Sequence, residues 1–389
     1  MHLKRITLFL TLLFLGCASN IEESVQTTIQ AIRNQVAPDK RVALFDISAS
    51  KKDGEIILTG ETNLPEGIAV LEDSLQKHGI RYKNSIIVLP DTSLGGNIFA
   101  VVNNSVSNLR SAPKHSGELA TQVLLGMPLK VLKKENSWYL VQTPEDYIAW
   151  VDGGGIQLMN SEQFENWKSD DKIIYLDVYG NAYSQSNKNA DKVTDLVAGD
   201  ILKLNGEKDG FFSVEYPDGR KAFIYKPEAK LFSDWVNSLN PTQETLVTTA
   251  KEFLGLPYLW GGTSTKGVDC SGFTKTIYLL NGVVIPRDAS QQVYSGILVD
   301  STRNFDVLLP GDLLFFGRPK NGDKPQKVVH VGMWIGNNEY IHSSEHVRIN
   351  SMDPNAENFD EYNYNRYLET KRIFENWQGN IISVSKMFN

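Results

Sequence analysis

Hydrophobic and polar positions divide the 389-residue chain into three stretches with different periodicities. Between residues 22 and 95, segments with helical spacing alternate with short segments that have the period of strands. The expected helices span 23–35 and 66–78, and the expected strands span 41–48, 55–62 and 85–89, with the turn Lys52-Asp53-Gly54 between the first two. This order predicts a small α/β unit. It contains no residue with obvious chemistry, so we interpret it as a spacer or docking domain.

Residues 96–230 contain a repeat at an offset of 73 residues, without a gap. The apolar segments 126–131, 138–141 and 149–151 of the first copy fall on 199–204, 211–214 and 222–224 of the second. Short alternating strands with turn signals predict one small β-barrel for each copy, at 96–160 and 165–232. Four aromatic residues are expected to fill the barrel cores: Trp138, Tyr139, Phe211 and Phe212. Tyr147 of the first copy corresponds to Arg220 of the second, so the barrel itself does not require a tyrosine there.

Residues 240–389 form a third region with mixed helical and strand periodicity. Asn240-Pro241 is typical of a helix start, and this helix is expected to run to Phe253. A glycine-rich loop follows, and a second helix is expected from about Cys270 to Asn281-Gly282. Three strands are expected after it, at 313–316, 328–335 and 339–343. The pattern predicts an α+β domain in a multidomain protein.

The composition is that of a soluble globular protein, with 41% hydrophobic and 22% charged residues. The formal net charge is −7, and no block of Lys and Arg stands out. Both features disfavour a nucleic-acid-binding protein.

The first residues have a composition of their own. Lys4 and Arg5 precede an apolar run from Ile6 to Leu15, which is followed by Gly16-Cys17. This pattern is typical of a secretory signal, and the run is too short to span a bilayer comfortably. A cysteine after Phe14-Leu15-Gly16 resembles a bacterial lipoprotein signal, in which the cysteine is lipidated and becomes the first residue. Removal of residues 1–16, with their two basic side chains, would change the formal charge from −7 to −9.

The resemblance implies an exported protein anchored to a membrane through lipid at Cys17, with a signal peptide at 1–16 and the small α/β domain at 17–95. The alternative is plain secretion with an incidental cysteine. If Cys17 carries lipid, the second of the two cysteines, Cys270, is the sole thiol, and no intramolecular disulfide can form.

Cys270 falls at the predicted start of a helix. The amides and the dipole of a helix N-terminus stabilise a thiolate, and the same amides can face the oxyanion that forms when a thiolate attacks a carbonyl. This position therefore suits a nucleophile, which also needs a base. The alternative is a buried structural thiol.

Three of the six histidines lie in the same region as this cysteine: His330, His342 and His346. Alternation along a strand places His330, Gly332 and Trp334 on one face, and in the next strand Tyr340 and His342 share a face. Two adjacent strands can thus present His330 and His342 side by side, one as the base and the other as its orienting partner. His346 competes for the orienting role. A zinc site of Cys270, His342 and His346 is the remaining alternative, but its spacing matches no common zinc motif, so we expect no metal and no cofactor.

Several motifs occur in the order found in a known family. They are Tyr258-Leu-Trp260-Gly261-Gly262, Asp269-Cys270-Ser271-Gly272-Phe273, Pro286-Arg287-Asp288, Leu309-Pro310-Gly311-Asp312-Leu313, His330-Val-Gly332-Met and Tyr340-Ile-His342. Over about 130 residues the region resembles the NlpC-type, papain-like cysteine peptidases of the bacterial cell wall. The resemblance implies Cys270 as nucleophile, His330 as base and His342 as the orienting residue. It gives Tyr258 an auxiliary role, and it places Trp260, Asp269 and Ser271 among the substrate-binding residues, although Asp269 and Ser271 also suit a helix cap.

The preceding repeats resemble tandem bacterial SH3-like domains, with Asn108-Leu109-Arg110-Ser111-Ala112-Pro113 opening the first. Two such domains before this catalytic domain resemble the γ-D-glutamyl-L-diamino acid endopeptidases, also called dipeptidyl-peptidase VI. In that group an acidic residue and a tyrosine of the first SH3-like domain hold the free amine of L-Ala. Glu118 and Tyr147 match those positions, with a solvated loop carboxylate and barrel packing as the alternatives. Arg287 and Asp288 are weaker candidates for the D-Glu end of the substrate.

The resemblance therefore predicts a peptidase that cuts the bond between γ-D-Glu and meso-diaminopimelate or Lys in peptidoglycan stem peptides, during murein turnover or recycling. A carboxylate that faces an ammonium selects a free N-terminal L-Ala and rejects intact wall. Two other functions stay open: a non-catalytic wall-binding lipoprotein, and an acyltransferase on a related Cys-His fold.

Overall fold

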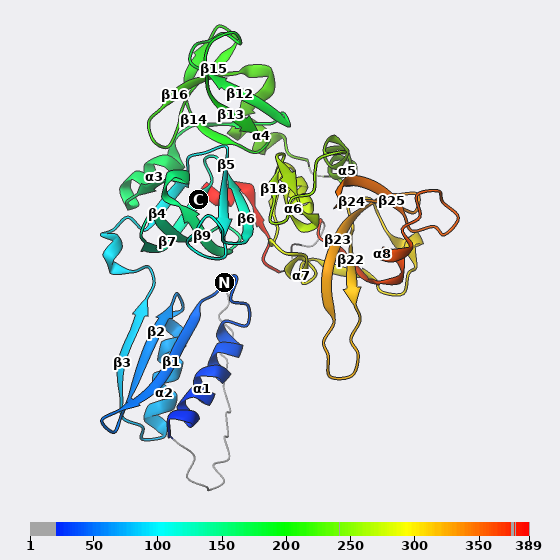
Figure 1. Ribbon diagram of the computed structural model, residues 1–389. Helices are drawn as coiled ribbons and strands as arrows, with labels where there is room; N and C mark the ends of the chain where they lie inside the picture. The colour runs from blue at the N-terminus through cyan, green and yellow to red at the C-terminus, as the bar shows by residue number, and fades with distance from the viewer. Residues whose placement is uncertain (1–20, 241, 375–376, 378, 389) are drawn as a thin grey trace. The chain divides into compact units, whose positions relative to one another are not determined.

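The computed structural model describes residues 21–240, 242–374, 377 and 379–388 (Figure 1). The predicted signal and the lipidation site Cys17 lie outside the described residues. Within the part of the chain that is described, no helix is both long and apolar enough to cross a membrane. Contacts divide the chain into two units that meet between Leu89 and Pro90.

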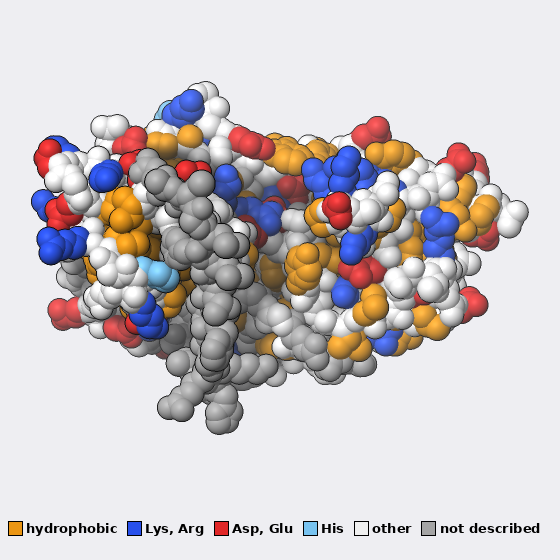
Figure 2. Space-filling model, turned by 90° about the horizontal axis from the view of Figure 1, so that it is seen from below, with side chains coloured by type: hydrophobic (Ala, Val, Ile, Leu, Met, Phe, Trp, Pro, Cys, Tyr) orange, Lys and Arg blue, Asp and Glu red, His pale blue; other side chains and the backbone are white. Residues whose placement is uncertain are grey.

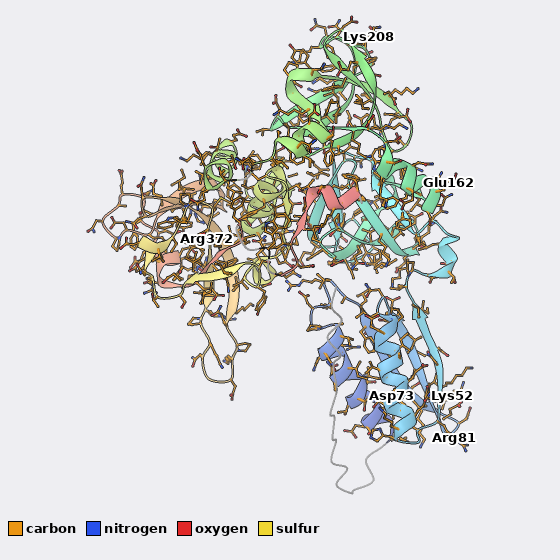
Figure 3. The ribbon with its side chains drawn as sticks, turned by 180° about the vertical axis from the view of Figure 1, so that it is seen from behind. Lys52, Asp73, Arg81, Glu162, Lys208 and Arg372 are labelled. Atoms are coloured by element: carbon orange, nitrogen blue, oxygen red, sulfur yellow. The ribbon has the colours of Figure 1, made fainter. Side chains whose placement is uncertain are left out.

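The first unit is a three-stranded sheet covered by two helices. Its elements are α1 (Ile21–Val36), β1 (Phe45–Lys52), β2 (Glu55–Thr62), α2 (Pro65–Lys77) and β3 (Tyr82–Val88). β1 and β2 pair antiparallel, whereas β3 pairs parallel to β2 because α2 carries the chain back along the sheet. Figure 3 shows Asp73 on α2, with Lys52 and Arg81 near the ends of β1 and β3.

Two boundaries of this unit differ from those expected. The first strand begins at Phe45 and not at residue 41, because Arg41 forms an ion pair with Asp39 at 2.7 Å within a turn. The unit ends at Leu89 and not at 95, because Leu94 already packs into the core of the next domain.

The second unit begins with two seven-stranded antiparallel sheets. The first comprises β4 (Phe99–Val102), β5 (Val106–Arg110), β6 (Leu119–Leu124), β7 (Pro128–Glu135), β8 (Trp138–Gln142), β9 (Ile148–Asp152) and β10 (Ile156–Met159), with 3₁₀ turns η1 (Thr92–Leu94) and η2 (Gly153–Gly155). The helix α3 (Ser161–Ser169), whose second residue Glu162 is labelled in Figure 3, leads to the next sheet. That sheet comprises β11 (Lys172–Tyr175), β12 (Tyr179–Tyr183), β13 (Lys192–Val197), β14 (Ile201–Lys208), β15 (Phe211–Glu215), β16 (Lys221–Tyr225), η3 (Lys226–Glu228) and β17 (Ala229–Leu231), and α4 (Phe232–Ser238) follows it.

The repeat seen in the sequence recurs in the strand pairing. The strand order is β10-β4-β7-β8-β9-β5-β6 in the first sheet and β17-β11-β14-β15-β16-β12-β13 in the second, so corresponding strands occupy the same places. The register also corresponds: Val131 pairs with Val141 in the first sheet, and Leu204 pairs with Val214 in the second. A bulge follows Val131 and Leu204 alike. These matches lie at the same offset of 73 residues.

The remainder of the second unit contains a helix-covered antiparallel sheet of six strands in the order β21-β26-β22-β23-β24-β25, together with two small sheets of two strands each, β18-β19 and β20-β27. Its helices are α5 (Gln243–Glu252), α6 (Cys270–Leu280), α7 (Ala289–Gln292) and α8 (Glu361–Asn365), with 3₁₀ turns η4 (Phe305–Val307) and η5 (Val384–Phe388). Its strands are β18 (Thr263–Ser264), β19 (Gly267–Val268), β20 (Val283–Val284), β21 (Ile297–Asp300), β22 (Leu313–Arg318), β23 (Lys327–Gly336), β24 (Glu339–Ser344), β25 (His346–Ser351), β26 (Tyr367–Arg372) and β27 (Ile382–Ser383). Phe273 and Ile277 of α6 are fully buried against Val331 and Met333 of β23.

Polar contacts fix the first barrel to this catalytic region. Gln122 of β6 accepts hydrogen bonds from the backbone N–H of Thr263 at 3.0 Å and from the Ser264 hydroxyl at 2.9 Å. Lys275 in the middle of α6 forms an ion pair with Glu145 of the barrel at 3.0 Å, and both side chains are buried. The barrel is therefore held directly against the helix that begins at Cys270.

The surface carries charges of both signs. Figure 2 shows Lys and Arg side chains interspersed with Asp and Glu on the face seen from below. This distribution agrees with the sequence, which has no basic block.

Candidate active site

Cys270 is the first residue of α6, and its position depends on a close-packed helix start. Asp269 caps the helix by accepting a hydrogen bond from the backbone N–H of Gly272 at 2.7 Å. A side chain at Gly272 would be impossible, since a Cβ there would lie 1.9 Å from the carbonyl oxygen of Gly262. The backbone N–H groups of Val331 and Ser271 donate to the Cys270 sulfur, which places the thiol against β23 beside His330.

The two histidines expected on adjacent strands do meet. His330 Nε2 on β23 lies 2.7 Å from His342 Nδ1 on β24, and both side chains are buried. His346 is exposed at the start of β25. The contact favours His342 over His346 as the residue that orients His330.

Burial keeps all three groups uncharged in the resting site. Desolvation, followed by the charge of Asp269, raises the pKa of Cys270 to about 12, despite the two backbone N–H groups. Desolvation also lowers the pKa of His330 well below its usual value and that of His342 to about 4. Burial therefore opposes the stabilisation of a thiolate that the helix N-terminus was expected to provide. The pair is a thiol and a neutral imidazole, so proton transfer must accompany attack.

Tyr258 lies beside the thiol. Its backbone N–H donates to the carbonyl of Glu345 at 2.9 Å, and it forms a β-bridge with Val268 just ahead of the nucleophile helix. Burial, followed by the charges of Cys270 and Asp269, raises the pKa of the Tyr258 hydroxyl. The protonated phenol is thus a hydrogen-bond donor near the reacting sulfur.

Arg287, a weaker candidate for contact with the D-Glu end of a substrate, is instead bonded to other side chains of the protein. Its side chain is 1% exposed and forms a bidentate ion pair with Asp269, in which the shorter N–O distance is 2.6 Å. It also donates to Ser271 Oγ at 2.9 Å and to Thr121 Oγ1 of the first barrel at 2.9 Å. Arg287, Asp269 and Ser271 therefore form a buried cluster that supports the start of α6.

Two pairs of other predicted residues make contacts between the first barrel and the catalytic region. The Trp260 indole donates to Glu118 Oε1 at 2.8 Å, and both side chains are exposed. The Tyr147 hydroxyl donates to Asp288 Oδ2 at 3.4 Å. These contacts place two carboxylates, a phenol and an exposed indole along the junction between the first barrel and the catalytic region.

Asn350 was not singled out from the sequence. Its Oδ1 lies 3.0 Å from His342 Nε2, and it reaches this position because β25 pairs with β24. No local pattern around Asn350 marks it. The register of the hairpin formed by β24 and β25 brings it to His342.

Comparisons with known proteins agree with this site. Residues 255–368 match the model of the NlpC/P60 family, and residues 104–157 match that of the bacterial SH3 domain. A gamma-D-glutamyl-L-lysine dipeptidyl-peptidase from Bacillus cereus is 32% identical over 248 residues, which cover 62% of this chain and 72% of that protein. Dipeptidyl-peptidase 6 from Lysinibacillus sphaericus is 28% identical over 271 residues, covering 65% and 92% respectively. The crystal structure of an NlpC/P60 family protein from Bacillus cereus has a TM-score of 0.60 at 26% identity, over 71% of this chain and 99% of that chain.

Proposed function

Because the chain belongs to the NlpC/P60 family, we propose that it is a cysteine peptidase that cuts the bond between γ-D-Glu and the diamino acid of peptidoglycan stem peptides. The observation that carries this proposal is the 2.7 Å contact between His342 on β24 and His330 on β23, the strand that also touches Cys270. A thiol with an oriented neutral imidazole can split amide hydrolysis into acylation and deacylation.

The reaction then proceeds in two steps. The Cys270 sulfur attacks the γ-carbonyl carbon while His330 takes the thiol proton, and the backbone N–H of Cys270 at the start of α6 can donate to the developing oxyanion. His330 returns the proton to the nitrogen of the diamino acid as the C–N bond breaks, which leaves a thioester on Cys270. A water molecule, deprotonated by His330, hydrolyses that thioester and restores the thiol.

We further propose that the junction with the first barrel selects a free N-terminal L-Ala. The carboxylates of Glu118 and Asp288 lie near the indole of Trp260 and the phenol of Tyr147, respectively. Such carboxylates suit an ammonium group and repel the α-carboxylate of D-Glu. We therefore assign Asp288 to the amine end of the substrate and give Arg287 a supporting role, since its guanidinium already holds Asp269.

The proposal extends to location and architecture. A substrate in the cell wall implies export, and the signal pattern supports a lipid anchor at Cys17. The second barrel repeats the strand order and register of the first, which supports a second SH3-like domain. A role in murein turnover or recycling follows from a preference for stem peptides already freed from glycan. A non-catalytic wall-binding role is disfavoured by the assembled Cys270, His330 and His342.

Product analysis tests the bond that is cut. L-Ala-γ-D-Glu-meso-diaminopimelate and its L-Lys counterpart are incubated with the wild type and with Cys270→Ala, and products are identified by mass spectrometry. We expect release of the dipeptide L-Ala-γ-D-Glu by the wild type alone. Absence of cleavage of both peptides by well-folded wild-type protein, or equal cleavage by Cys270→Ala, would contradict the proposal.

A further inference from the structure

A chain of three hydrogen bonds leads from the proposed base to a backbone carbonyl. His330 Nε2 meets His342 Nδ1 at 2.7 Å, and His342 Nε2 meets Asn350 Oδ1 at 3.0 Å. At the far end, Asn350 Nδ2 donates to the backbone carbonyl of Asn358 at 3.0 Å. The chain of hydrogen bonds therefore ends at a backbone carbonyl, which can only accept.

This last contact determines the orientation of the Asn350 amide. A backbone carbonyl only accepts, so the NH₂ group of Asn350 must face Asn358. A flipped amide would place two oxygens against each other. The Asn350 oxygen consequently faces His342 and accepts a hydrogen bond from its Nε2–H group.

The protonation of both rings follows from this orientation. Burial lowers the pKa of both histidines, so each neutral ring carries one N–H. With its hydrogen on Nε2, His342 has a bare Nδ1, which accepts the hydrogen bond from His330 Nε2–H. His330 is then left with a bare Nδ1, the atom that can take the proton of the Cys270 thiol.

We propose that Asn350 is a positioning residue that fixes the tautomers of His342 and His330 and so makes His330 Nδ1 the base. This inference rests on the proposed role of His330 and adds a fourth residue to the catalytic chain. Other charged groups act on the pair through space. Arg348 and Arg366 lower the pKa of both rings, whereas Asp360 raises that of His342. None of these groups replaces the acceptor that Asn350 supplies.

The test compares three variants of the full chain. Asn350→Leu removes both hydrogen bonds, and Asn350→Asp keeps an acceptor for His342. The matched control is Asn355→Leu, because Asn355 lies exposed in the following loop and bonds only to Asp353 among the described contacts. kcat and KM are measured against pH on L-Ala-γ-D-Glu-meso-diaminopimelate, and ring tautomers are read from ¹⁵N NMR of labelled histidine.

We expect kcat of Asn350→Leu to fall by about 10- to 100-fold with KM nearly unchanged, the loss typical when a hydrogen-bond partner that fixes the tautomer and orientation of a metal-bound histidine is removed. The ¹⁵N spectrum should lose its single Nε2–H tautomer for His342. Asn350→Asp should retain most of kcat at neutral pH, with the acid limb moved to higher pH because a carboxylate stabilises the imidazolium. Asn355→Leu should match the wild type.

Two outcomes would overturn the inference: wild-type kcat in Asn350→Leu, or an unchanged Nε2–H tautomer of His342 in that variant. The NMR result does not depend on the substrate. If the wild-type protein cleaved none of the stem peptides, the proposed function would fail while the tautomer measurement would still decide the role of Asn350.

Discussion

Gly332 on β23 lies in direct contact with the strand that carries His342. A Cβ at position 332 would come within 3.1 Å of His342 Cβ and within 2.6 Å of Cδ2 of Tyr340. The two strands can approach closely enough for the histidines to meet because position 332 lacks a side chain.

Gly332→Ala should therefore separate His330 from His342. Overpacking of this kind costs about 1–3 kcal/mol of stability, and a displacement near 1 Å can cost about 100-fold in rate. We expect kcat to fall by about that factor while the protein stays folded at 25 °C. The control is Gly154→Ala, where a Cβ would contact only a carboxylate oxygen of Asp152 at 3.1 Å. Wild-type kcat in Gly332→Ala would show that the close approach is not needed.

The resting protonation state predicts how Cys270 reacts with an alkylating agent. Because burial raises its pKa to about 12 and lowers that of His330, little thiolate exists near neutral pH. The alkylation rate with iodoacetamide should rise with pH from 5 to 9 without reaching a plateau, whereas kcat/KM should persist below pH 6.5, where the buried base is still neutral. A plateau in alkylation at acidic pH would instead indicate a preformed thiolate–imidazolium pair.

The buried histidines also link stability to pH. The pKa of His342 is about 4 in the folded protein and near 6.5 when unfolded, so the unfolded state binds more protons below pH 6.5. The unfolding free energy should be unaffected by this group above pH 6.5 and should fall as the pH drops toward 4, by about 3 kcal/mol from His342. Urea unfolding of the wild type and His342→Gln at several pH values measures the difference. A wild-type curve parallel to that of His342→Gln would exclude this linkage.

The ion pair between Lys275 and Glu145 should hold the first barrel in place. Their side chains are 7% and 3% exposed, so removal of one partner leaves a buried charge without compensation. Lys275→Met or Glu145→Leu alone should cost about 3–5 kcal/mol, and the two substitutions combined should recover much of that loss. A thermodynamic cycle from denaturant unfolding gives the coupling. Additive losses in the double variant would mean that the pair contributes nothing as a pair.

The sequence predicted those features that depend on local pattern or on a repeat. α6 begins at Cys270, as its flanking residues indicated, and strand alternation placed His330 and His342 on adjacent strands, where their side chains meet. The offset between the barrels reappears in the pairing of Val131 and Leu204 with their partners.

The features that the sequence did not predict depend on burial and on strand register. Arg287 follows a motif that suggests contact with substrate, yet the fold closes over it and pairs it with Asp269. The raised pKa of Cys270 reflects the desolvation that the completed core imposes. Asn350 reaches His342 through the register in which β24 pairs with β25, and the sequence around Asn350 does not indicate that register.

The selection of a free amine is the central claim about specificity, and a pair of substrates tests it most directly. kcat/KM is measured for L-Ala-γ-D-Glu-meso-diaminopimelate and for the same peptide acetylated on L-Ala, with Glu118→Gln as a second enzyme. Charge-assisted hydrogen bonds to the ammonium predict a preference of about 100-fold or more for the free peptide, reduced in Glu118→Gln. Equal kcat/KM for the two peptides with the wild-type enzyme would contradict the account.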